Sequence, residues 1–197
     1  HNGKAIATFY QCGEGYVLDP ETLENQGIAP WVPLDGISAH PKVDEATGEL
    51  MFFNYSKHPP YMHYGVVDAD GKLVTYVPIE LPGPRLPHDM CFSENWSILN
   101  DLPVFWDAEL MKHRNLHAVR LHGGVPSRFA LIPRHGTAED VRWLEAEPTY
   151  VLHWLNAYEE VDEVILHGYF EDNPTPKPEA FEQYGEHAHM MAYVEQH

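Results

Sequence analysis

Hydrophobic and polar residues alternate over short segments along most of the chain, which is the pattern of β-strands rather than of long amphipathic helices. Residues 49–56 form one strand-like run, and residues 62–81 form two more such runs separated by Asp70-Gly71. An Asp-Gly pair between alternating runs is typical of a two-residue hairpin turn. The pattern therefore predicts an all-β protein that contains a meander of antiparallel strands.

Acidic, turn-forming clusters recur ahead of the strand-like segments, in "LDPETLENQG", "VDEATGEL" and "DADGKL". This weak self-similarity at a few tens of residues is the spacing expected of β-propeller blades. Residues 108–116 are compatible with a short helical turn, and residues 171–181, with three prolines, with an extended loop. No second domain is evident, so we expect a single domain over residues 1–197.

The stretch "YVLHWLNAYEE", residues 150–160, has the bulky apolar composition of the most buried strand in the chain. Strict alternation would give this strand two apolar faces and place it inside its blade. The two expected faces are Val151, His153 and Leu155 on one side, and Leu152, Trp154 and Asn156 on the other.

Three of the 14 histidines begin, or lie inside, apolar strand-like segments: His40, His88 and His153. Taken singly, each is compatible with a hydrogen-bonded core histidine. As a set, His88 follows His40 by 48 residues and His153 follows His88 by 65, which is about one blade each. Successive blades would then direct one imidazole each toward a common axis, with the ring nitrogens within about 5 Å of one another. Neutral imidazoles in this arrangement suit iron, zinc, copper or nickel.

The composition restricts the class of ligand. The formal charge of −18, from 12 Lys and Arg against 30 Asp and Glu, argues against a nucleic-acid partner and favours a neutral or apolar ligand. Cys12 and Cys91 both lie among strand-like residues and are expected to be buried, reduced thiols, which indicates a cytoplasmic location. No apolar run reaches the roughly 18 residues of a membrane span.

Several longer motifs resemble the carotenoid cleavage oxygenase family, which also includes apocarotenoid-cleaving and stilbene-cleaving enzymes. They are "SAHPKVDEATGELMFFNY", "LPHDMCFSENWSILNDLPVFWD", "PSRFALIPRHG" and "VRWLEAEPTYVLHWLNAYEEVDEVILHGYF", in the family's order. The resemblance implies a seven-bladed β-propeller of which this chain forms about three central blades, with N-terminal and C-terminal blades outside it. It also implies an axial Fe(II) held by four histidines, three of which map onto His40, His88 and His153. The fourth would lie beyond residue 197.

The function that this resemblance implies is O2-dependent cleavage of a C=C double bond in a carotenoid or apocarotenoid, giving two carbonyl products without a general acid or base. Because such a polyene is strongly apolar, we expect the protein to associate peripherally with a membrane in order to take up its substrate. Stilbene-type cleavage, polyene isomerisation and a catalytically inactive interaction module are the alternatives. A hydrolytic zinc enzyme using the same histidines is a further one.

In this family, glutamates accept hydrogen bonds from the outer ring nitrogens of the metal-bound histidines. The first such glutamate aligns with Gln11, and Glu14 is the nearby alternative. Tyr10 takes the place of a lysine that stilbene-cleaving members tend to carry, which makes a stilbene substrate less favoured. Residues 1–197 alone would leave blade faces uncovered, so we expect them to be marginally stable, to bind Fe(II) weakly and to be inactive.

Overall fold

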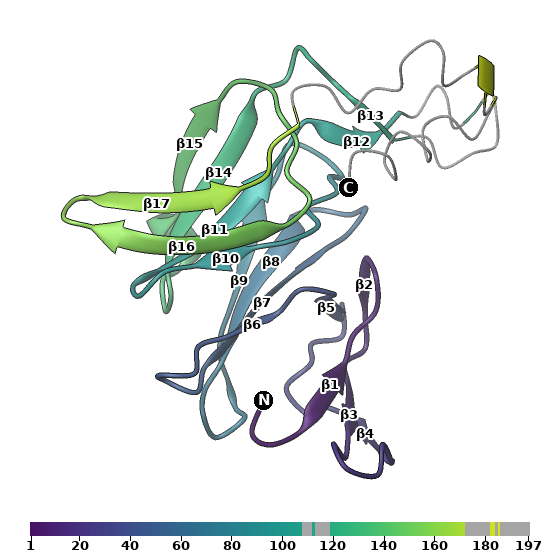
Figure 1. Cartoon of the computed structure of the whole chain (residues 1–197), viewed down its shortest axis with the longest axis vertical. Helices are drawn as coiled ribbons and strands as arrows, with labels where there is room; N and C mark the ends of the chain where they lie inside the picture. The colour runs from purple at the N-terminus through teal and green to yellow at the C-terminus, as the bar shows by residue number, and fades with distance from the viewer. Residues whose placement is uncertain (108–111, 113–118, 172–181, 184, 186–197) are drawn as a thin grey trace.

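Antiparallel strands make up nearly all of the regular structure. The structure is a computed structural model and describes residues 1–107, 112, 119–171, 182–183 and 185 (Figure 1). The expected helical turn at 108–116 and the expected loop at 171–181 lie almost wholly outside these residues. In chain order the strands are β1 Ala5–Ala7, β2 Cys12–Gly13, β3 Tyr16–Leu18, β4 Asn25–Ile28, β5 Ile37–Ser38, β6 Lys42–Val43, β7 Leu50–Tyr55, β8 Tyr61–Val67, β9 Leu73–Glu80, β10 Cys91–Phe92, β11 Trp96–Asp101, β12 Val104–Trp106, β13 Val119–Leu121, β14 Ser127–Pro133, β15 Arg142–Ala146, β16 Trp154–Glu160 and β17 Glu163–Gly168.

Two four-stranded antiparallel sheets follow one another along the chain, as blades of a propeller do. The first has the order β6-β7-β8-β9 and the second the order β10-β11-β14-β15, with the β12-β13 hairpin inserted between β11 and β14. Strands β16 and β17 begin a third sheet, and the N-terminal strands form the small sheets β1-β3-β4 and β2-β5. Figure 1 shows the sheets succeeding one another from the purple to the yellow end of the chain. The all-β class predicted from the sequence is confirmed.

The three acidic clusters form the same turn. Asp19, Asp44 and Asp68 each accept, through Oδ1, a hydrogen bond from the amide two residues further on, at 2.9–3.0 Å. The backbone amide of each also bonds the carbonyl of the residue that closes its hairpin, at 2.9–3.0 Å. An Asx turn of this kind lets the side chain satisfy backbone groups that the ladder leaves open.

The hairpin between β8 and β9 is present, but its turn is longer than the two residues expected from Asp70-Gly71. The amide of Asp68 bonds the carbonyl of Lys72, so five residues form the loop, and the last strand pair is Val67 with Leu73. Gly71 has φ +81, a conformation that glycine adopts without strain. The Asx turn of Asp68 therefore sets the length of this loop.

The most buried strand is β7, in which all six residues are buried. Its alternating side chains enter two cores. Met51 and Phe53 join a core with the second blade, and Leu50 and Phe52 join a core with Trp31 near the N-terminus. Strand β7 lies between β6 and β8, so it is the interior strand that the apolar pattern had placed at residues 150–160.

The prediction that residues 150–160 form an interior strand with two apolar faces is wrong. Strand β16 begins only at Trp154, pairs with β17 within the described part of the chain, and leaves Leu155 60% exposed. Val151 and Leu152 are both buried, although they are neighbours in sequence, because they enter a separate core ahead of the strand. His153 therefore lies at the entrance to β16 rather than within it.

Two further expectations concern thiols and membrane spans. Cys12 and Cys91 are free thiols, the first partly buried and the second buried, and burial raises the pKa of Cys12 to about 12. Within the described residues, no helix has the length and apolarity needed to cross a bilayer.

Gly65 provides a test of the packing between β7 and β8. It is the cross-strand partner of Phe52, whose ring covers it so closely that a Cβ on Gly65 would lie 2.3 Å from Phe52 Cζ. We expect Gly65→Ala to lower the free energy of unfolding by about 1–3 kcal/mol, measured by urea denaturation, because the ring must leave its position. Gly123→Ala, with no atom within 4 Å of the added Cβ, should change it by less than about 0.5 kcal/mol. Equal stabilities of the two variants would contradict the packing described here.

Candidate metal centre

The three predicted histidines occupy equivalent places in the fold. Each stands just ahead of the first strand of a sheet: His40 before β6, His88 before β10 and His153 before β16. The blades of a propeller surround a central channel, so equivalent places in successive blades direct side chains to the same region.

The imidazole rings form a nearly equilateral triangle. The ring centroids are 4.6 Å apart for His40 and His88, 4.9 Å for His40 and His153, and 5.0 Å for His88 and His153. One nitrogen from each ring lies within 4.8 Å of those of the other two. The convergence predicted from the spacing is confirmed.

The Nε2 atoms of His40 and His88 are 3.0 Å apart. Two nitrogens bound to one metal at ~2.1 Å and at right angles to each other also lie about 3 Å apart. The pair therefore has the separation of two adjacent ligands of one ion.

The electrostatics favour the neutral, metal-binding form of His40. Burial lowers its pKa, and the positive charge of Lys42 and the neighbouring His153 lower it further, against an opposing effect of Asp89. A neutral imidazole has a free nitrogen lone pair, which is the form a metal binds. Three imidazoles with converging nitrogens form a donor set that fits a divalent transition metal.

The structure does not bring the two expected partner residues, Gln11 and Glu14, into an evident supporting role. Gln11 is exposed, with φ +72, and Glu14 accepts a hydrogen bond from the hydroxyl of Tyr16. Tyr10, next to Gln11, has its ring 5.6 Å from that of His88. A contact of Gln11 or Glu14 with a ligand histidine therefore stays a prediction.

Asp89 belongs to a motif that the sequence analysis quoted, "LPHDMCFSENWSILNDLPVFWD", but its role at this site was not predicted. It is 2% exposed, and its Oδ1 accepts hydrogen bonds from Lys42 Nζ at 2.6 Å and from its neighbour Met90 N at 2.8 Å. Its Oδ2 accepts one from Trp154 N at 2.9 Å. Lys42 follows His40 by two residues and Trp154 follows His153 directly, so one carboxylate contacts all three histidine-bearing segments. The available signal was a charged residue directly after His88 at the start of an apolar segment.

A second carboxylate, that of Glu159, joins two of the same sheets further along β16. It accepts hydrogen bonds from Ser93 Oγ at 2.6 Å, from Asn95 N at 2.8 Å and from Asn95 Nδ2 at 2.9 Å. Ser93 and Asn95 lie in the turn between β10 and β11. Glu159 thus fastens the second and third sheets several residues after His153.

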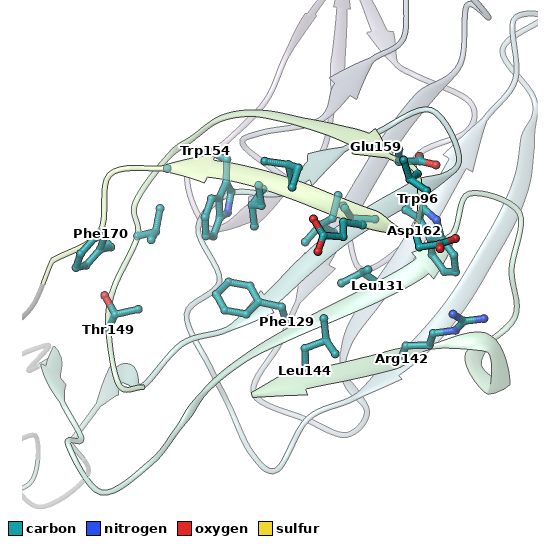
Figure 2. Close-up of a pocket in the computed structure, with 18 residues that line it drawn as sticks. Trp96, Phe129, Leu131, Arg142, Leu144, Thr149, Trp154, Glu159, Asp162 and Phe170 are labelled. Atoms are coloured by element: carbon teal, nitrogen blue, oxygen red, sulfur yellow. The ribbon is translucent and has the colours of Figure 1, made fainter. Parts of the chain in front are cut away.

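A groove of about 1020 Å³ lies between the β16-β17 hairpin and the strands β11, β14 and β15. Figure 2 shows Phe129, Leu131 and Leu144 on one side of it and Trp154 on the other. None of the three histidines is among its described lining residues. The groove is therefore an inter-sheet space and not the metal centre.

Together, successive antiparallel blades and histidines converging from three of them define a β-propeller with a candidate metal centre. A family model described as retinal pigment epithelial membrane protein matches residues 1–193. The chain belongs to this family, which is the carotenoid cleavage oxygenase family that its motifs predicted.

Relatives of known activity are similar over most of this chain. Carotenoid 9,10(9',10')-cleavage dioxygenase 1 of Phaseolus vulgaris is 35% identical over 84% of the chain and 32% of its own length. Isoeugenol monooxygenase of Pseudomonas nitroreducens is 33% identical over 81% of the chain and 34% of its own length. The chain thus spans about a third of the relatives that it matches.

The solved structure of Pseudomonas brassicacearum lignostilbene dioxygenase has a TM-score of 0.72 and 31% sequence identity to the chain. The likeness covers 84% of this chain and 36% of that one. It confirms that the sheets described here form part of a β-propeller.

Glu159 offers a test of how the sheets are held together. We expect Glu159→Gln to lower the free energy of unfolding by roughly 1–2 kcal/mol, because the amide NH2 replaces an acceptor and then faces a donor from Ser93 or Asn95. Glu160→Gln, an exposed neighbour, is the matched control and should have little effect. Thermal unfolding of the two variants would measure the difference, and a silent Glu159→Gln would show that these hydrogen bonds do not fasten the sheets.

Proposed function

We propose that the protein containing this chain is a non-haem Fe(II) dioxygenase that cleaves a C=C double bond of a carotenoid or apocarotenoid to two carbonyl products. The observation that carries the proposal is the convergence of His40, His88 and His153 from three separate sheets. Oxygenases among the relatives support it. On this proposal residues 1–197 are one partial propeller domain.

His40, His88 and His153 would hold the iron, together with a ligand supplied from outside the described residues. Iron bound there would supply the activation of O2, the part of the reaction that no side chain provides. The chain's own contribution is to hold the three ring nitrogens at fixed separations and to keep His40 neutral by burial. Gln11 and Glu14 are kept as proposed partners of the ligand histidines.

The substrate class rests on the relatives. The Phaseolus vulgaris relative is named for carotenoid cleavage, which supports a polyene. The net negative charge of the chain is compatible with an apolar, uncharged substrate, and a cytoplasmic protein would meet such a substrate at a membrane surface. Polyene isomerisation and an inactive interaction module stay as alternatives for the tests below.

Cleavage of a phenolic alkene is the second candidate. The lignostilbene dioxygenase of Pseudomonas brassicacearum and the isoeugenol monooxygenase of Pseudomonas nitroreducens both resemble the chain at 30% identity or more. Tyr10, whose ring lies beside that of His88, is half exposed and carries a hydroxyl that could bond a phenol. A stilbene is therefore included beside the carotenoids in the assay.

Metal analysis tests the proposed centre. In the full-length protein loaded anaerobically with Fe(II) and then desalted, we expect about one iron per chain. His40→Ala, His88→Ala and His153→Ala should each weaken iron binding by more than about tenfold, because loss of a ligand costs at least as much as loss of a group that orients one. His58→Ala, at an exposed position, is the control. Zinc in place of iron would favour a hydrolytic enzyme, and no metal in the wild type would contradict the metal centre.

Product analysis tests the reaction. Under 18O2 we expect the Fe(II)-loaded full-length protein to convert a carotenoid or apocarotenoid into aldehyde or ketone fragments that carry the label, detected by mass spectrometry. The three alanine variants should lose this activity. Labelled fragments from a stilbene alone would establish the second candidate, and unlabelled rearranged polyene would indicate isomerisation. If the iron-loaded protein incorporates no label and changes no substrate, the catalytically inactive interaction module is the remaining alternative.

A further inference from the structure

Asp89 lies where the three histidine-bearing segments meet, and its carboxylate is buried. Both oxygens are occupied, Oδ1 by Lys42 Nζ and the amide of Met90, and Oδ2 by the amide of Trp154. Its main chain is held as well, because Asn100 Nδ2 donates to the Asp89 carbonyl at 2.7 Å. A side chain fixed at both ends has little freedom to move.

The partners of the Asp89 carboxylate lie close in sequence to the other two histidines. Lys42 lies two residues after His40 and is the first residue of β6, where it is paired with Met51 of β7. The Trp154 amide belongs to the first residue of β16, directly after His153. Asp89 itself directly follows His88. Displacing this carboxylate would shift the three segments relative to one another.

We propose that Asp89 is a positioning residue that sets the separations of the His40, His88 and His153 imidazoles, with Lys42 as its partner from the first blade. The described ladders do not pair β6, β10 and β16 with one another, so backbone hydrogen bonds cannot set these separations. A charged acceptor with two oxygens can receive all three donors, whereas an amide can receive them through one oxygen only.

Asn at this position would therefore be a poor substitute despite its matching shape. If its oxygen takes the place of Oδ1, its NH2 group faces the amide N–H of Trp154. If its oxygen takes the place of Oδ2, the NH2 group faces the Lys42 ammonium and the Met90 amide. In either orientation two hydrogen-bond donors face each other. The first orientation loses the hydrogen bond to the segment that bears His153, and the second loses the one to the segment that bears His40.

Glu159 separates positioning from general support. It is also a carboxylate, it also accepts several hydrogen bonds between the second and third sheets, and it lies several residues along β16 from His153. A purely structural contribution by Asp89 would make Asp89→Asn and Glu159→Gln alike, with lower thermal stability and an unchanged metal site.

The inference rests on the proposed metal centre, and its test is Co(II) binding to the full-length protein. The dissociation constant is measured by competition with a coloured chelator, and the visible absorption of bound Co(II) reports the geometry of its ligands. We expect Asp89→Asn to raise the dissociation constant about 10- to 100-fold, as the loss of groups that orient metal ligands does, and to alter the absorption bands. Glu159→Gln should leave both at their wild-type values while lowering the unfolding temperature.

Wild-type affinity and absorption in folded Asp89→Asn would overturn the inference and leave the proposed function standing. Absence of Co(II) binding to the wild type would overturn both. If Asp89→Asn does not fold, Lys42→Met is the deciding variant. The Lys42 side chain is 25% exposed, and the substitution keeps its aliphatic stem and the Trp154 link while it removes the ammonium. We then expect a rise of about tenfold in the dissociation constant, and unchanged binding by Lys42→Met would overturn the inference.

Discussion

A single geometric constraint governs this structure: three sheets that share no described backbone ladder must begin within a few ångströms of one another. Metal sites tolerate deviations of only about 0.2 Å in ligand distance. Packing of apolar side chains between blades is dense but not directional, so it brings the sheets together without fixing their ends. Directional contacts are needed at these ends, and the carboxylate of Asp89 supplies one at Trp154, the first residue of β16. The carboxylate of Glu159 fastens the second and third sheets several residues further along the strand, away from the histidines.

The two carboxylates meet different electrostatic conditions. Asp89 is 2% exposed, and a charge so deeply buried is tolerated only when it is paired and fully hydrogen-bonded, as it is here by Lys42 and two backbone amides. Glu159 is partly exposed, and water can replace part of what its hydrogen bonds supply. The buried and fully paired carboxylate of the two is therefore the one beside the histidines, where the separations of the ring nitrogens matter most.

The sequence predicted the fold class and the convergence of the three histidines because both follow from a repeat. Each repeat unit is one blade and supplies one imidazole. It failed at residues 150–153, since Val151 and Leu152 enter a core beside Tyr150, and an apolar run does not distinguish a buried extended segment from a paired strand. The role of Asp89 was out of reach for another reason. Its partners are distant in sequence, and only the folded chain brings Lys42 and Trp154 to one carboxylate.

Charge links the site to the composition. Three histidine ligands would bring no negative charge to a divalent metal, and the carboxylate of Asp89, which directly follows His88, is already paired with the Lys42 ammonium. The chain as a whole carries a formal charge of −18. A negative field raises the local concentration of cations and repels anionic ligands. A net negative charge around a neutral donor set thus favours the binding of a cation over that of an anion.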